Sequence, residues 1–348
     1  MSAPDLILLA MAIPLIGAVL IVLVGKSPNL RETVTFATAI SLFAVVVSLV
    51  SGVFHGERPA VSLIEILPGL DIRFEIEPLG MMFATIAGLL WVVNTLYSIG
   101  YMRGNRERNQ TRFYICFAIA IFGALGVAMA ANLFTLFVFY EVLTLSTYPL
   151  VAHKGDAAAE RGGRIYLLTL LGTSIGLFLM AIMATWVLAG QNLDFVPGGL
   201  LADKGISPTV ATVLLILFAF GIGKAALMPF HFWLPNAMVA PTPVSALLHA
   251  VAVAKAGVFT VMKVSVYIFG EDLLNATPGR EFVLWVACFT IIAASLIAMT
   301  KDNLKARLAY STISQLSYIV LGDQAFNGYP SDFAFFGRGY VFWVIWII

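Results

Sequence analysis

Four of the ionisable residues inside the long apolar stretches of this sequence are candidates for proton chemistry: Glu141, Lys224, His249 and Lys255. If such stretches cross a membrane, an ionisable group at mid-bilayer costs roughly 2.5–3.5 kcal/mol on insertion scales, so it tends to face a partner or water and to mark an ion path. A carboxylate, two amines and an imidazole can each take up and release a proton. These residues therefore predict a proton path through the membrane.

Glu141 is the only one of the nineteen acidic residues that falls in the middle of a predicted span, at 133–151. The alternative to a proton-carrying role is an interhelical ion pair that serves packing alone. Both interpretations place the carboxylate in the interior of a helix bundle, because facing lipid would leave it without any polar partner.

Lys224 follows Gly223 and precedes Pro229, which removes a backbone hydrogen bond from any helix that contains it. Further prolines at 235, 241 and 243 prevent regular helix through the next stretch. The pattern predicts a discontinuous helix whose break exposes backbone dipoles and admits water at membrane depth. The alternative is a proline kink with a lysine that reaches the membrane interface.

Lys255 lies about twelve residues from each end of its apolar stretch, too deep to reach either interface, which favours a functional role. Lys263 is eight residues, or about 12 Å, further along and can extend to the surface. His249, near the start of the same stretch, is a candidate accessory proton carrier. His231 lies at the break, and a lone intramembrane histidine is often only a structural hydrogen-bonding group.

These groups can form a relay if they approach one another in the bundle. At about 6 Å and an effective dielectric constant near 20, a glutamate and a lysine attract by about 3 kcal/mol. Moving Lys224 toward or away from Glu141 would then switch its proton affinity. This is a hypothesis about distances that the sequence does not contain.

The elements that would hold these residues are transmembrane helices. The 348 residues are 60% hydrophobic and 11% charged, with a mean hydropathy of +0.95, whereas soluble domains are about 25% charged. The net charge of +1 creates no overall electrostatic field that would attract nucleic acid. About eleven apolar segments recur without two-residue alternation, which predicts helices. They are 6–24, 33–54, 79–99, 113–129, 133–151, 165–189, 209–234, 244–269, 282–299, 306–322 and 333–348.

Basic residues concentrate on alternate loops, twelve on one side against four on the other. The positive-inside rule therefore predicts an outside N-terminus and a bacterial plasma (inner) membrane, with the twelve in the cytoplasm. The twelve are Lys26, Arg31, Arg103, Arg106, Arg108, Arg112, Lys154, Arg161, Arg164, Lys301, Lys305 and Arg307, and the four are Arg58, Arg73, Lys204 and Arg280.

We therefore expect an all-α, polytopic bundle of about eleven helices in which the seventh, 209–234, is broken. Residues 1–348 form a single membrane domain in this interpretation. Its parts are N-terminal helices over 1–112, a first repeat with the broken helix over 113–270, and an incomplete second repeat with a divergent tail over 271–348.

No cofactor or metal site is expected in this chain. Cys116 and Cys288 stand far apart with no second Cys or His near either in sequence, so neither an iron–sulfur cluster nor a zinc site can be built locally. No glycine-rich nucleotide loop follows a strand. Any redox chemistry would belong to other chains of an assembly, and whether an enzymatic label applies stays open.

Several segments resemble the antiporter-like subunits shared by respiratory complex I (chains L, M and N), the Mrp-type sodium/proton antiporters and the membrane-bound hydrogenases. The motifs are nearest to the D-type member of the Mrp antiporters and the M-type member of complex I. The matching segments are 132–141 (NLFTLFVFYE), 223–235 (GKAALMPFHFWLP), 240–250 (APTPVSALLHA), 255–258 (KAGV) and 302–315 (DNLKARLAYSTISQ).

The resemblance implies that Glu141, Lys224 and Lys255 correspond to the family's channel glutamate, broken-helix lysine and central lysine, with His249 as an accessory member. It also implies two inverted helix repeats, protons or sodium ions as the transported species, and other membrane subunits as partners within the lipid bilayer.

The resemblance ends near Gly322, and the aromatic tail to Ile348 does not continue it, so we expect a truncation, a frameshift or a fragment. Three functions remain open. The first is a proton-translocating subunit of a redox-driven pump or a cation/proton antiporter. The second is a quinone-interacting oxidoreductase subunit, and the third is a truncated structural subunit without transport.

Overall fold

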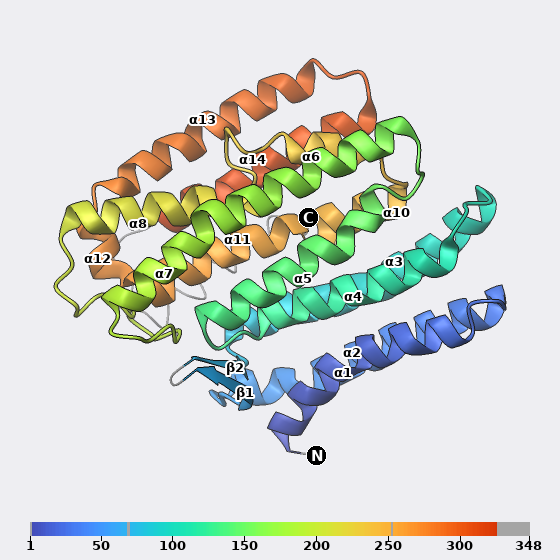
Figure 1. Cartoon of the computed structure of the whole chain (residues 1–348), viewed down its shortest axis with the longest axis horizontal. Helices are drawn as coiled ribbons and strands as arrows, with labels where there is room; N and C mark the ends of the chain where they lie inside the picture. Colours follow the sequence, from blue (N-terminus) through green and yellow to red (C-terminus); the bar gives the residue numbers. More distant parts are fainter. Residues whose placement is uncertain (1, 68–69, 252, 326–348) are drawn as a thin grey trace. The chain divides into compact units, whose positions relative to one another are not determined.

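The computed structural model describes residues 2–67, 70–251 and 253–325. The chain forms two compact units. The first comprises Met1–Leu167 and Val239–Val253, and the second comprises Leu168–Met238 and Ala254–Ile348. Figure 1 follows the chain by colour through both units, each of which is described by itself.

The first unit is a group of long antiparallel helices. Proline stands in the first turn of α1, α2, α3 and α10, where its missing N–H costs no hydrogen bond. Helix α1 packs on α2 and α4, α2 on α3, and α4 on α5. The helices are α1 Ala3–Leu23, α2 Pro28–Phe54, α3 Pro78–Gly104, α4 Gln110–Ala128, α5 Leu133–Val151, the first part of α6 Ala157–Thr173, and α10 Thr242–Ala246 with a π-helical turn Leu247–Val251.

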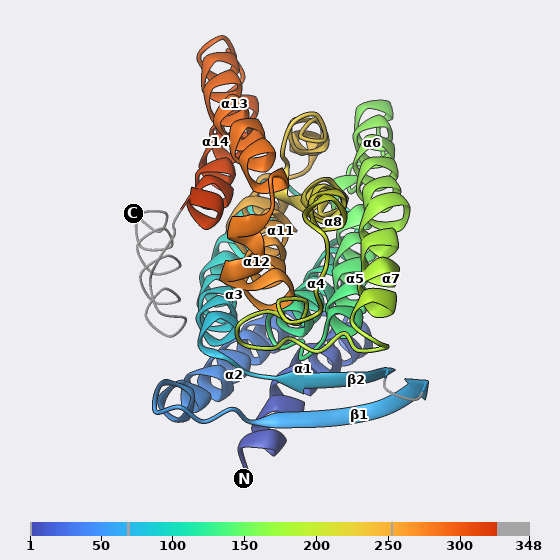
Figure 2. The same cartoon turned by 90° about the vertical axis from the view of Figure 1, so that its left-hand side faces the viewer.

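A β-hairpin is the one departure from helix that the sequence analysis did not expect. Strands β1 Ala60–Leu67 and β2 Leu70–Glu75 pair antiparallel (Figure 2), with Ala60 opposite Glu75. The hairpin is tied to the start of α5, where Asn132 Nδ2 donates to the Asp71 carbonyl at 2.9 Å. The expectation of an all-α chain is therefore confirmed for the helical bundle but was wrong for this segment.

The second unit continues through shorter and more irregular helices. Helix α8 packs on α7, α12 and α13, and α13 packs along α14. The elements are the rest of α6, a π-helical turn Ser174–Phe178, α7 Leu179–Leu188, α8 Pro208–Gly221, a 3₁₀ turn Gly223–Ala225, α9 Trp233–Asn236, α11 Val253–Lys263, a π-helical segment Val264–Phe269, α12 Gly270–Ala276, α13 Gly279–Met299 and α14 Leu304–Ala325; a further 3₁₀ turn, Ala237–Val239, joins α9 to α10.

In the described residues, eight helical runs are long and apolar enough to cross a membrane, and Pro208–Gly221 is a shorter apolar helix. Ten of the expected apolar segments coincide with helices, including the one expected to be broken. The eleventh, 333–348, lies outside the described residues. The number of crossings, their orientation and the division at 112 and 270 stay predictions.

Candidate functional site

The helix break expected at Lys224 is present. Helix α8 ends at Gly221, Ile222 leaves the helical region at ψ 60°, and the chain makes one 3₁₀ turn before Ala226 adopts a left-handed conformation at φ +56°. The Lys224 side chain in this turn is fully buried, with 0% exposure. A cation just beyond a helix C-terminus is favoured by the partial negative charge of the terminal carbonyl groups. The local glycines and prolines thus place a buried amine at the end of α8.

The break is closed by its own backbone and by one indole. The Ile222 and Gly223 carbonyls accept from the amides of Ala225 and Ala226, at 2.9 and 3.1 Å. The buried Nε1–H of Trp233 also donates to the Gly223 carbonyl, at 2.9 Å. Carbonyl groups that an interrupted helix would leave unpaired are therefore satisfied inside the protein, as a membrane interior requires.

Lys255 lies on α11, which packs directly on the break. A Cβ atom at Gly257 would collide with the main chain of Lys224 and Ala225, so only glycine allows this approach. The Lys255 side chain is 3% exposed. The structure therefore brings the Lys224 turn and the helix that carries Lys255 into backbone contact within the second unit.

Lys263 is buried at the far end of α11 rather than open to solvent, with 1% exposure. Its ammonium lies over the Phe195 ring at 4.4 Å and near the Phe259 ring at 5.6 Å, both within reach of cation–π attraction. Phe195 belongs to the loop between α7 and α8 and covers the end of the helix. The sequence allowed the Lys263 side chain to extend to the membrane interface. In the structure this side chain is instead enclosed.

Glu141 occupies the middle of α5 in the first unit. Both carboxylate oxygens are buried and have no hydrogen-bond partner among the described residues. An ionised carboxylate without fixed donors is costly in such surroundings. Among the described residues, the structure gives Glu141 no hydrogen-bonded partner of the kind that an interhelical ion pair would need.

A buried hydroxyl pair lies near Glu141 and was not anticipated. Thr147 donates to the Leu143 carbonyl at 2.6 Å, and its hydroxyl lies 2.6 Å from the Tyr166 phenol. Either hydroxyl can be the donor of this second bond, since each carries one hydrogen that can rotate. Tyr166 is also close enough to Glu141 for their charges to interact. The sequence could not predict this pairing, because Thr147 on α5 and Tyr166 on α6 are brought together only by the packing of the two helices.

The two histidines occupy different surroundings. His249 lies in the π-helical turn Leu247–Val251, which packs on α3, where Asn94 donates to the Pro243 carbonyl at 3.3 Å. His231, at the break, has its ring 6.1 Å from that of Tyr310. The structure therefore assigns His249 to the first unit with Glu141, and His231 to the second with Lys224 and Lys255.

Two buried polar clusters lie outside the residues selected from the sequence. In the first unit, Glu32 accepts from Arg103 at 2.9 Å and from Arg31 at 3.4 Å. In the second, Gln324 donates to Asp323 at 2.9 Å and to Ser265 at 3.2 Å. The sequence analysis had placed Arg31 and Arg103 in loops and had made no prediction for the other three charged or amide groups. Over the described ranges, no group of three or more His, Cys, Asp or Glu residues could hold a metal ion.

The family described as "NADH:quinone oxidoreductase/Mrp antiporter, TM" matches residues 130–344, more than half of the chain. The chain belongs to this family. The match contains Glu141, Lys224, His249 and Lys255, and it confirms the resemblance inferred from the motifs. With its apolar helices, it identifies this antiporter-family chain as a multi-pass membrane protein.

Two curated relatives of this antiporter-family chain illustrate its range. The antiporter subunit mnhA2 of Staphylococcus haemolyticus is 32% identical over 300 residues, covering 82% of this chain and 36% of the relative. The chloroplastic NAD(P)H-quinone oxidoreductase subunit 5 of Chlorokybus atmophyticus is 29% identical over 335 residues, covering 89% and 50%. The chain thus spans a third to a half of these relatives, which differ in type from the D-type and M-type members that the motifs suggested.

A solved structure of the Mrp complex from Dietzia sp. DQ12-45-1b contains a similar chain. It superposes with a TM-score of 0.79 at 26% identity and covers 92% of this chain and 34% of that one. The antiporter-family chain therefore shares its fold with that chain over most of its length.

Proposed function

We propose that this chain is a proton-translocating membrane subunit of a multisubunit complex, either a redox-driven quinone oxidoreductase or an Mrp-type cation/proton antiporter. The observation that carries the proposal is Lys224, a fully buried lysine in a satisfied helix break. A lysine with only a packing role would not need an interrupted helix around it. Broken helices at membrane depth are typical of transporters, where they build ion sites.

Glu141, Lys224 and Lys255 are proposed as the proton-carrying groups, with His249 as an accessory. Lys224 and Lys255 lie in neighbouring helical segments of the second unit, so a small displacement of one segment changes the electrostatic balance at the other. At roughly 6 Å a glutamate–lysine contact contributes about 3 kcal/mol, which is about a hundredfold in proton affinity. Such coupling would let one subunit exchange protons in response to its neighbours.

The names of the relatives and of the solved complex support the presence of partner subunits in the same membrane. We propose that this chain likewise works beside other membrane subunits, in a bacterial plasma membrane, and that protons, with or without sodium ions, are its substrates. The charge asymmetry of the loops supports a cytoplasmic location for the basic ends.

The test is proton uptake by proteoliposomes that contain the intact complex, with Glu141→Gln or Lys224→Met in this chain. Each variant has a matched control that makes the same chemical change at an exposed site, Glu160→Gln and Lys204→Met. We expect both buried variants to abolish uptake, while the controls retain it, provided that all four assemble equally.

Two other results would assign a different function. Normal uptake by assembled Glu141→Gln and Lys224→Met complexes would make the buried charges structural and the chain a non-conducting membrane subunit. Loss of quinone reduction before any loss of proton coupling would favour the quinone-interacting alternative.

A further inference from the structure

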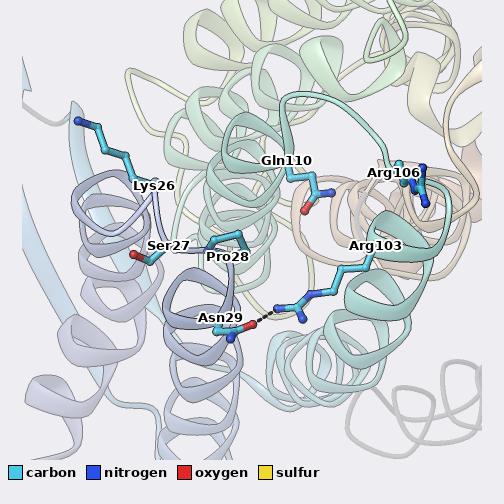
Figure 3. A pocket seen from close by; sticks show the side chains of 7 residues that line it. All are labelled: Lys26, Ser27, Pro28, Asn29, Arg103, Arg106 and Gln110. Carbon is cyan, nitrogen blue, oxygen red and sulfur yellow. Dashed lines mark hydrogen bonds between the residues drawn. The ribbon is translucent and has the colours of Figure 1, made fainter.

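An open pocket of about 650 Å³ lies at one end of the first unit, where four helix termini meet. Helix α1 ends and α2 begins on one side, and α3 ends and α4 begins on the other. Figure 3 shows the side chains around it, with Arg103 reaching from α3 to Asn29 of α2. The polar and charged lining residues are Lys26, Ser27, Asn29, Arg103, Arg106 and Gln110.

The lining carries three cations and no acid. The Glu32 carboxylate, which contacts the lining residue Arg103, is also shared with Arg31. Glu107, in the same turn as Arg106, does not line the pocket and interacts with His153 instead. In the described part of the chain, Lys26 and Arg106 take part in no ion pair. The pocket therefore presents an excess of positive charge.

Neutral donors converge on the same space. Ser27 caps α2, but its hydroxyl makes no capping bond, and Pro28 follows as the first helical residue. The amides of the first turn of a helix point outward without intrahelical partners and favour anions. Arg103 donates from Nε to Glu32 and from Nη2 to Asn29. The guanidinium has five N–H groups, so further donors are left over from these two bonds. Cations, amides and a hydroxyl together match the oxygens of a phosphate group.

An apolar groove on the same helix pair indicates what the phosphate is attached to. It has a volume of about 280 Å³ and runs between α1 and α2. Val34 on its wall is six residues, or about 9 Å, beyond Pro28, so the groove begins within two turns of the pocket. Leu23 and Leu30, beside the α1–α2 turn, are exposed apolar side chains. A polar pocket above an apolar groove fits a headgroup above an acyl chain.

We propose that this pair of cavities binds an anionic phospholipid, with its phosphate at Arg103, Arg106 and the start of α2 and an acyl chain between α1 and α2. A polar cluster at helix ends could instead be only a solvated basic surface, as cytoplasmic loops commonly are. The apolar groove beside the pocket favours the lipid site, because a basic surface that only contacts water has no reason to lie next to such a groove.

The experiment uses the full chain purified in detergent and a photoreactive phosphatidylglycerol. Crosslinking is quantified on peptides that contain the α1–α2 turn, in competition with unlabelled phosphatidylglycerol, phosphatidylcholine of the same acyl chains, or inorganic phosphate. We expect phosphatidylglycerol to compete strongly and phosphatidylcholine weakly. Because each cation near a lipid surface is worth roughly fivefold in affinity, Lys26→Gln with Arg106→Gln should weaken binding by about thirtyfold.

The matched control is Arg58→Gln with Arg161→Gln, which removes the same charge at exposed positions of the first unit that do not line the pocket. It should leave binding within about twofold of the unmodified chain, because neither side chain belongs to the proposed phosphate site. Both double variants keep the Arg31–Glu32–Arg103 cluster, so neither should alter folding, which a thermal unfolding midpoint checks.

Ala37→Phe separates the lipid from a soluble phosphate compound, because Ala37 lines the groove and not the pocket. If a lipid is bound, filling the groove lowers crosslinking while the pocket still responds to phosphate. Displacement by inorganic phosphate with no effect of Ala37→Phe would assign the pocket to a soluble phosphate and overturn the lipid. Equal competition by the two lipids, or equal loss in the control, would overturn the site itself.

Discussion

Gly257 of α11 lies against the main chain of Lys224, where a Cβ atom at Gly257 would stand 2.7 Å from the Lys224 carbonyl oxygen. The neighbour is backbone, so no flexible side chain can move aside. This contact fixes the broken end of α8 against the helix that carries Lys255. The two buried lysines are therefore held by one packing contact.

Gly257→Ala should separate α11 from the break and destabilise the chain by about 1–3 kcal/mol, the usual cost of overpacking. The measurement is the thermal unfolding midpoint in detergent, together with proton uptake by the complex. Gly176→Ala is the control, since a Cβ there meets open space and alanine favours helix over glycine. Equal midpoints for the two variants would show that the contact is looser than the structure has it.

Trp233→Phe should weaken the break by removing one of the two donors to the Gly223 carbonyl, which keeps its bond from the Ala226 amide. The expected loss of stability is about 0.5–1.5 kcal/mol, the net contribution of one hydrogen bond. Trp285→Phe makes the same change on the exposed face of α13 and should cost much less. A Trp233→Phe chain as stable as the Trp285→Phe chain would mean that another group, water included, satisfies the carbonyl.

The break could be predicted from sequence because its causes are local. Gly223, Pro229 and the following prolines act through their own backbone geometry, and no distant partner is needed. The hairpin was missed although Pro68-Gly69 separates two isoleucine-containing runs, a pattern typical of strands joined by a turn. A search for apolar segments of membrane length passes over strands of this size.

The contacts around the site could not be predicted, because they join residues far apart in sequence. Gly257 meets Lys224 across thirty-three positions, and the sequence contains no measure of that approach. Lys263 was expected to be able to reach the surface, but whether Phe195 covers it depends on the path of a loop. Tyr166 and Thr147 pair for the same reason, through packing rather than spacing.

Glu32→Gln tests the cluster at the ends of α2 and α3. Glu32 and Arg31 are both buried, and Arg31 also donates to Gln110 at 2.6 Å. Removing one partner of a buried ion pair leaves an uncompensated charge, which costs about 3–5 kcal/mol. Because Arg31 keeps its other hydrogen bonds, we expect the free energy of unfolding to fall by about 3 kcal/mol, the lower end of this range. Glu160→Gln removes an exposed pair with Arg164 and should cost at most about 1 kcal/mol. Chemical unfolding of both variants gives the comparison.

His153 gives the chain a dependence on pH outside the membrane spans. It lies in the turn between α5 and α6 and is buried beside the Phe113 ring. Burial, with the nearby positive charge of Arg112, lowers the pKa of His153 below its usual 6.5, and Glu107 opposes the shift. The unfolded chain therefore binds a proton more readily than the folded chain. Stability contributed by neutral His153 is present above about pH 6.5 and is lost as the pH falls below that value.

The thermal midpoint of the detergent-solubilised chain should accordingly fall between about pH 7.5 and about pH 5.5, and His153→Gln should reduce that fall. The control is His55→Gln, which removes an exposed histidine and leaves the buried one in place. Because His231 and His249 are present in both variants, their titration cancels in the comparison. The same fall with pH in the His153→Gln chain as in the unmodified chain would show that protonation of other groups controls acid stability, and that the α5–α6 turn tolerates a charged His153.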